Sequence, residues 1–395
     1  MPKNIVILLD GTSNEICSNR TNILRLFGTL QKGPEQVVYY SPGVGTFGAA
    51  NAWSYWVRKA IELWGMATGW GLDQVVKEAY RFVIDHYDNG NRTGGESVGR
   101  DRIYIFGFSR GAYSARVLAG FINALGLVAK DNLNLIDPAY RAYKSVTESG
   151  DVQAEWQEMN LYDRILAPDH PPIRCLGVFD TVASVIEIGR YRPRFRSHAC
   201  TSENPSVEAV RHAVAMDERR NLFQPLLWVM GQSYFGDRFG QVALGPQDAR
   251  ELWFAGVHGD VGGGFPEQQS ALAKVPLDWM IRETTPMGLI YKTETVEDLV
   301  LGENASNKPV NKYVAPDPLA AANQSMNWAW GLLEFLPRWI PRNERPWRRD
   351  VLGFYLPLFS RRRISDDAIL HVSVQQRAAV EGPSPNAPDK PIYQA

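Results

Sequence analysis

One short segment carries a side chain that could act as a nucleophile. Residues 107–111 read Gly-Phe-Ser-Arg-Gly, between the apolar run 103–106 and an alanine-rich run that extends to residue 125. Such spacing is typical of a nucleophile elbow, a turn from strand to helix so sharp that Gly107 and Gly111 must lack side chains. The pattern predicts Ser109 as the nucleophile. The alternative is a structural or phosphate-binding turn, although the dinucleotide fingerprint Gly-x-Gly-x-x-Gly is absent here.

A serine hydroxyl needs a base that takes its proton, and the chain has six histidines. His258 directly follows the apolar run 252–257, at a strand end of the kind where ligands gather in open α/β folds. His371 is the competitor, but its apolar surroundings indicate a packed strand residue. The others fall in expected helices or polar loops: His86, His170, His198 and His212. We therefore expect His258 to be the base.

The base in turn needs a carboxylate that fixes its tautomer and stabilises the imidazolium. Asp180 directly follows the apolar run 173–179, and it gives the chain order Ser, Asp, His. Asp260 is the alternative, but because it lies two residues after His258 we expect it to brace the loop. For Asp180 itself, the competing interpretation is a capping residue at a strand end.

An oxyanion hole requires two N–H donors aimed at the developing charge. We expect one from Arg110, the residue after the nucleophile, where the start of the following helix also favours negative charge. The second is expected from Gly11 or Thr12, which follow the first apolar run, 5–9. Asp10 would support this turn. A helix cap is an equally open interpretation of the same residues.

Apolar runs alternate with helical patterns along the chain. The expected strands are 5–9, 37–40, 103–106, 173–179 and 252–257, and the clearest helices are 21–30, 72–87 and 112–125. Alternation of this kind predicts βαβ units and a parallel sheet. We therefore expect an α/β fold: a mostly parallel, α/β-hydrolase-like sheet flanked by helices, with helical insertions that form a lid or cap.

Three regions are expected along the chain. Residues 1–303 would form the core, with a Trp-rich insertion near 44–71 that is either an acyl-binding lid or part of the core. Residues 304–382 are rich in Trp, Arg and Pro and would pack on that core. The tail, 383–395, has a composition that favours disorder.

The charge balance and the cysteines limit the function classes. Lys and Arg total 42 against 43 for Asp and Glu, which argues against a nucleic-acid partner. Cys17, Cys175 and Cys200 form neither a disulfide framework nor metal-ligand spacing, so we expect a reducing compartment and no cofactor or cysteine-held metal. Metal dependence stays open, because Asp10, Asp180 and Asp260 could gather near one cation. With no signal-like or membrane-spanning apolar run, we expect a cytoplasmic protein, or export by a route that needs no signal.

Five motifs in order resemble one known family. They lie at 9–12 (Leu-Asp-Gly-Thr), 40–46, 106–112, 178–182 and 254–264. Together they are similar to an uncharacterised α/β-hydrolase domain family that includes phospholipase effectors of type VI secretion, over most of residues 3–375. The resemblance implies a triad of Ser109, Asp180 and His258, and esterase or phospholipase A activity on glycerophospholipids. For an effector it implies an inhibitory immunity protein as partner.

Other functions stay open at this point. A thioesterase or acyltransferase would use the same triad, and a non-catalytic binding module would keep only the fold. Tryptophans 328, 330, 339 and 347 are interleaved with arginines, a composition that suits contact with a membrane surface. An ordinary packed subdomain with a basic rim explains the same composition.

Overall fold

A computed structural model describes residues 2–11, 19–43, 70–90, 99–146, 152–182, 186–188, 193–195, 198–303, 313–326, 328–335, 350–351 and 354–395. Thr12, Cys17, Trp339, Trp347 and nearly all of the Trp-rich insertion expected near 44–71 lie outside the described residues.

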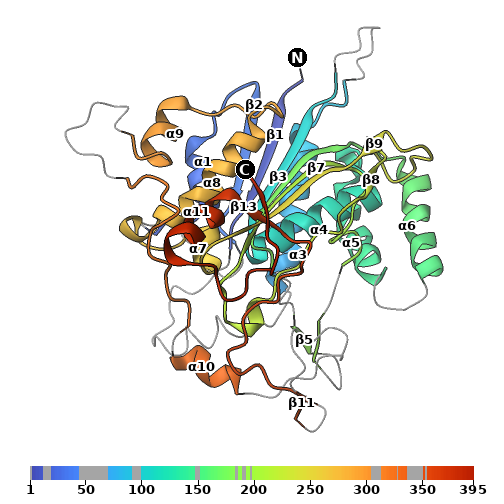
Figure 1. The fold of residues 1–395 in the computed structure, drawn as a ribbon. Coiled ribbons are helices and arrows are strands. Elements are labelled where there is room, and N and C mark those ends of the chain that lie inside the picture. Colours follow the sequence, from blue (N-terminus) through green and yellow to red (C-terminus); the bar gives the residue numbers. More distant parts are fainter. Residues whose placement is uncertain are drawn as a thin grey trace, which may run out of the picture.

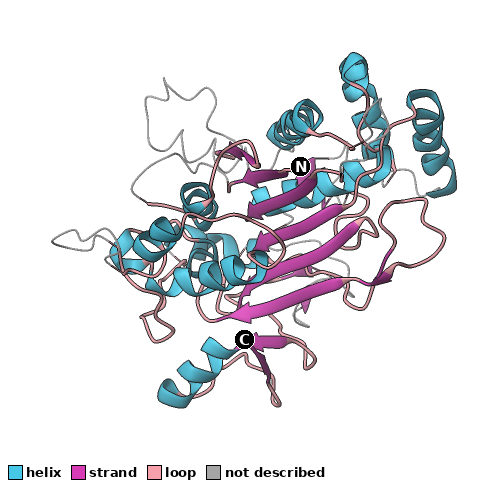
Figure 2. Cartoon of the chain, turned by 90° about the horizontal axis from the view of Figure 1, so that it is seen from above, coloured by secondary structure: helices cyan, strands magenta, loops and turns pink. Residues whose placement is uncertain are grey.

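In the described part of the chain, the main sheet holds eight strands in the order β14-β13-β10-β7-β4-β3-β1-β2, all paired in parallel. Their bounds are β1 Asn4–Leu9, β2 Gln36–Ser41, β3 Arg102–Phe108, β4 Ile173–Phe179, β7 Val207–Ala215, β10 Asp248–Phe254, β13 Ile369–His371 and β14 Ile392–Gln394. Figure 2 shows the central strands side by side with their arrowheads pointing the same way.

Among the described residues, three antiparallel ladders lie outside this sheet. They are β5 (Ile186–Ile188) with β6 (Pro193–Phe195), β8 (Ser233–Tyr234) with β9 (Gly245–Pro246), and β11 (Asp350–Val351) with β12 (Phe354–Tyr355).

Helices cover both faces of the sheet (Figure 1). One face carries α3 (Trp70–His86), α4 (Arg110–Leu125), η1 (Lys130–Leu135), α5 (Ile136–Ser145) and α6 (Val152–Leu166). The other carries α1 (Asn22–Thr29), α8 (Ala271–Thr284) and α9 (Thr293–Leu299). The shorter elements are η2 (Asn221–Phe223), α7 (His258–Gly262), η3 (Glu267–Gln269), α10 (Trp328–Glu334) and α11 (Val372–Glu381).

The first strand explains why the core has two halves. All six residues of β1 are buried, as expected for an apolar run between two helical layers. Ile5 and Ile7 pack with α3 and α4, whereas Val6 and Leu8 pack with α1 and α8. The expected α/β fold with a parallel, helix-flanked sheet is confirmed.

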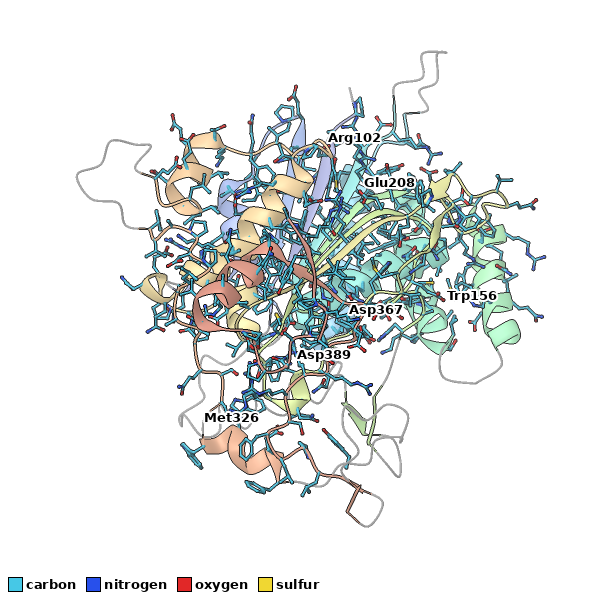
Figure 3. The ribbon with its side chains drawn as sticks, in the orientation of Figure 1. Arg102, Trp156, Glu208, Met326, Asp367 and Asp389 are labelled. Carbon is cyan, nitrogen blue, oxygen red and sulfur yellow. The ribbon has the colours of Figure 1, made fainter. Side chains whose placement is uncertain are left out.

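The strand order fixes where a site can form. The chain crosses from β1 to β2 on one side, and then from β2 to β3 on the other side of β1. In open α/β sheets, ligands bind in the crevice at the carboxyl ends of the strands beside such a switch point. Figure 3 labels Arg102 and Glu208 near the amino ends of β3 and β7, whereas Met326 lies beyond the opposite edge. Ser109 follows β3 at this carboxyl edge.

The expectation of a disordered tail is wrong. Residues 392–394 form β14, which pairs in parallel with β13. Asn386 Nδ2 also donates a hydrogen bond to the Met216 carbonyl, at 2.6 Å. Tertiary contacts of this kind order a segment whose Pro- and Ser-rich composition, taken alone, favours disorder. The preceding segment contributes β13 to the same sheet, so the sheet continues past residue 303.

A helix that crosses a bilayer needs about 20 consecutive, mostly apolar residues. Within the described ranges, no helix has both the length and the apolar character needed to cross a bilayer.

Candidate active site

Ser109 lies on a strained turn between β3 and α4. Its backbone has φ 58° and ψ −122°, a region that L-residues rarely occupy and that often marks functional sites. A Cβ on Gly107 would lie 2.4 Å from the Gly111 carbonyl oxygen, and a Cβ on Gly111 would lie 2.2 Å from the Leu9 oxygen. Gly107 therefore lets the start of α4 fold back closely on β3, and Gly111 lets it lie against the end of β1.

The Ser109 hydroxyl is not used to cap the helix. Ser109 is the N-cap residue of α4, yet its side chain makes no capping hydrogen bond. The first backbone N–H groups of a helix lack intrahelical partners, and they favour negative charge. Arg110 is the first residue of α4, so its N–H lies at this positive end of the helix. The turn thus places a hydroxyl at the positive end of a helix.

Asp180 directly follows β4 next to this turn, and it has a left-handed φ of 39°. Its carboxylate is fully buried and accepts hydrogen bonds on both oxygens. Oδ1 accepts from the Ala215 N–H at 2.9 Å and from Arg362 Nη1 at 2.5 Å. Oδ2 accepts from Arg362 Nη2 at 2.9 Å and from His258 Nδ1. Burial opposes ionisation, but the Arg362 charge and the His258 hydrogen bond outweigh it and hold the pKa of Asp180 well below its usual range.

His258 begins α7, after β10, and its ring is held on three sides. Nδ1 bonds Asp180, which orients the ring and leaves Nε2 as the proton-accepting nitrogen. The rings of Phe108 and Phe223 pack on the imidazole, with centroids 4.6 and 5.0 Å away. Burial lowers the pKa of His258 below its ordinary value, and the hydrogen bond with Asp180 offsets part of that effect.

The three candidate side chains therefore meet at one edge of the sheet. Phe108, which contacts the His258 ring, is the residue before Ser109. The Ser109 N–H donates to the carbonyl of Phe179, the residue before Asp180, at 3.1 Å. Between the described side chains of Ser109 and His258 no hydrogen bond is formed; in substrate-free enzymes such contacts often tighten only when substrate binds. The roles of these residues stay predictions.

Of the two residues expected to supply the second oxyanion donor, Thr12 lies outside the described residues and Gly11 has its N–H engaged elsewhere. The Gly11 N–H donates to Oδ1 of Asp10, at 2.7 Å, because an adjacent carboxylate is a strong acceptor. Oδ2 of Asp10 accepts from the hydroxyls of Thr21, at 2.5 Å, and Tyr40, at 2.9 Å. Asp10 thus ties the end of β1 to α1 and β2, which fits the expected supporting role.

Asp260 and His371, the alternatives for the carboxylate and the base, have other roles in the structure. Asp260 accepts from the Val257 N–H at 3.0 Å and from Asn323 Nδ2 at 2.6 Å, so it braces the loop, and burial raises its pKa. His371 stacks on Phe254 with ring centroids 4.5 Å apart, and burial lowers the pKa of His371 to about 4. It ends β13, as its apolar surroundings predict.

Sequence reasoning missed several neighbours of the triad. Arg362 comes from a run of three arginines, a pattern typical of a solvated face, yet it is buried. Glu218 accepts from the His258 N–H at 3.2 Å and pairs with Arg220, whose charge outweighs burial and lowers the pKa of Glu218 to about 2. His212, expected in a helix or polar loop, lies in β7 and is buried.

A sequence model described as the catalytic domain of Tle1-like type VI secretion phospholipase effectors matches residues 3–283. The uncharacterized protein YEL023C of Saccharomyces cerevisiae is 34% identical over 235 residues, a match that covers 57% of this chain and 32% of the yeast protein. The chain therefore spans about a third of that relative.

Two solved structures are also similar. An uncharacterized protein from Pseudomonas aeruginosa has a TM-score of 0.40 and 19% identity, with 74% of this chain and 46% of that chain covered. The Tle1 effector bound to the VgrG spike of the type 6 secretion system has a TM-score of 0.31 and 20% identity, with 69% and 53% covered. Since the family model spans well over half of the sequence, the chain belongs to the family of Tle1-like type VI secretion phospholipase effectors, through their catalytic domain.

Proposed function

We propose that the chain hydrolyses carboxylic esters, with Ser109 as nucleophile, His258 as base and Asp180 as the group that orients His258. The observation that carries the proposal is the buried hydrogen bond between His258 Nδ1 and Asp180, beside a serine on a strained turn. A neutral imidazole with Nδ1 occupied offers Nε2 for proton transfer.

The reaction follows from these positions. His258 Nε2 takes the Ser109 proton as Oγ attacks the ester carbonyl carbon, and the Arg110 N–H at the start of α4 donates to the resulting oxyanion. When the tetrahedral intermediate collapses, the bond between the carbonyl carbon and the leaving oxygen breaks. That oxygen takes the proton from His258 and departs as the alcohol. Water then attacks the acyl-enzyme with His258 again as base, releasing the carboxylic acid and restoring the Ser109 hydroxyl.

We propose a glycerophospholipid as the ester. Family membership supports this class, and so do the apolar side chains around His258. Phe223 packs on the His258 ring, and Trp330 of α10 packs on Phe223 with centroids 5.5 Å apart. Trp328 is 70% exposed and Phe335 is 56% exposed, at the start of α10 and just after its end. Aromatic side chains of this kind suit an acyl chain or a bilayer interface.

The test is ester cleavage by the purified chain. Fatty acid release from vesicles of phosphatidylethanolamine and phosphatidylglycerol would be measured together with hydrolysis of a short p-nitrophenyl ester. Ser109→Ala is expected to remove both activities, while Ser145→Ala, a matched change at the end of α5, leaves them intact. Cleavage that persists in Ser109→Ala would refute the assignment.

Two further measurements separate the competing functions. Acyl-CoA turnover well above phospholipid turnover would favour a thioesterase or acyltransferase. Failure of a fluorophosphonate probe to label Ser109 in the folded chain would favour a non-catalytic binding module.

Partners follow from the family. The Tle1 effector is solved bound to a VgrG spike, and we extend to this chain the proposal of a secretion-spike partner and a cognate inhibitory protein. Co-elution with a VgrG protein from the same source, and loss of Ser109-dependent hydrolysis on adding the inhibitor, are the expected results.

A further inference from the structure

The Asp180 carboxylate has a second side-chain partner besides His258, and it comes from a distant part of the chain. Arg362 lies between β12 and β13, beyond residue 283 where the match to the family's catalytic domain ends. Its guanidinium bonds both oxygens of Asp180, a two-point geometry that fixes orientation as well as charge. Arg362 and Asp180 are both buried, so solvent does not screen the pair.

The same guanidinium also holds two backbone groups of the site. Nη1 donates to the Ala215 carbonyl at the end of β7, at 2.7 Å, and Nη2 donates to the Phe223 carbonyl. The ring of Phe223 packs against His258. Arg362 therefore fixes both the carboxylate that bonds His258 and one of the aromatic rings beside it.

We infer that Arg362 is a positioning residue of this site, which keeps Asp180 ionised and aimed at His258 while the imidazole is neutral. This inference rests on the proposed function. Before proton transfer His258 carries no charge, and a buried carboxylate without a cation tends to take up a proton. The permanently charged Arg362 supplies that cation, and a protonated Asp180 would no longer stabilise the imidazolium.

The inference predicts how removing Arg362 changes the proton affinity of the Asp180–His258 pair. The charged groups facing His258 are Asp180, Glu218 and Arg220, and the last two form their own ion pair. Without Arg362, Asp180 would have only His258 as a cationic partner, so the Asp180–His258 pair should bind a proton at higher pH. An opposite charge at this range shifts a pKa by about one to three units.

The experiment compares Arg362→Gln with Arg362→Lys in the full chain. The matched control is Arg363→Gln, because Arg363 is the exposed neighbour. For Arg362→Gln we expect kcat/KM for a p-nitrophenyl ester to fall at least about tenfold near pH 6. The acid limb of its pH profile should lie about one pH unit or more above that of the wild type. Arg362→Lys should keep the limb at the wild-type pH with lower kcat/KM. An acid limb in Arg362→Gln that coincides with wild type would overturn the inference.

Two further measurements keep the inference testable in every case. NMR titration of His258 in wild type and in Arg362→Gln compares its pKa without any substrate, so it tests the inference even if the wild type cleaves no ester. A wild type that cleaves no ester would refute only the proposed function.

If Arg362→Gln does not fold, the double variant Asp180→Asn with Arg362→Met decides the question. Removing both charges should restore stability relative to Asp180→Asn alone. No recovery in the double variant would overturn the inference.

Discussion

Replacing Asp180 by Asn tests the charge arrangement of the site through stability as well as activity. In the wild type, Oδ2 of Asp180 accepts from Arg362 Nη2 and from His258 Nδ1. If the Asn oxygen stays at the Oδ1 position, its amide NH₂ group faces these two donors. Two charge-assisted hydrogen bonds are lost, at roughly 1.5–3 kcal/mol each. Removing one partner of a buried ion pair costs about 3–5 kcal/mol, so the estimate from hydrogen bonds and the estimate from the ion pair agree.

The control is Ser109→Ala. Alanine also has a Cβ, so the strain of the turn is unchanged, and the Ser109 hydroxyl makes no capping bond that could be lost. Urea unfolding at pH 7 should therefore show Asp180→Asn destabilised by roughly 3–5 kcal/mol and Ser109→Ala near the wild type. Both variants should lose activity; for Asp180→Asn the fall in kcat is about 10⁴-fold, because the wrong His258 tautomer is favoured.

The pH dependence gives a second test of the same substitution. The pKa of Asp180 is depressed in the folded state, so its stabilisation is present above the unfolded value of about 3.9 and is lost as pH falls below it. The stability gap between wild type and Asp180→Asn should therefore narrow below about pH 4. If Asp180→Asn is as stable as the wild type at pH 7, the argument that the buried ion pair of Asp180 and Arg362 stabilises the fold is refuted.

Three more outcomes are expected. Because the pKa of His258 is lowered by burial and a base must be neutral, the acid limb of kcat/KM should lie below pH 6.5, and a limb at pH 7 or above would contradict this. In urea unfolding, Gly111→Ala should be destabilised by roughly 3 kcal/mol or more, because its Cβ would lie 2.2 Å from the Leu9 oxygen. Gly33→Ala, where the added Cβ has open space around it, should unfold like the wild type. His371→Asn, which can still cap α11, should keep ester hydrolysis within about threefold, whereas His258→Gln loses several orders of magnitude.

The parts of the site that follow from local sequence could be predicted. The turn around Ser109 requires glycines at fixed spacing after an apolar strand, and Asp180 follows an equally clear apolar run. Both signals depend on neighbours within a few residues. The strands in question, β3 and β4, run to Phe108 and Phe179, so each side chain lies at the carboxyl edge as expected.

The long-range partners could not be predicted. Arg362 pairs with Asp180 across 182 positions, and a run of three arginines carries no sign that its middle member is buried. His212 was misplaced for a similar reason. Its strand, β7, also contains Glu208 and Arg211, which break the apolar pattern by which buried strands are recognised. Arg211 finds Glu283 and Asp248 in the fold, and such tertiary partners are what allow polar residues in a buried strand.

The molecule contains a second buried histidine–carboxylate pair, and comparing the two shows what distinguishes a candidate base. His212 Nδ1 bonds Glu251 at 2.8 Å, and its Nε2 accepts from the Thr181 N–H at 3.3 Å. Both ring nitrogens are thus engaged, and this histidine fixes the backbone that follows Asp180. His258 has the same chemical partner on Nδ1, but in the described part of the chain its Nε2 has no hydrogen-bond partner. A histidine and a carboxylate in contact are therefore insufficient to define a base, since the second nitrogen must also remain open beside a nucleophile.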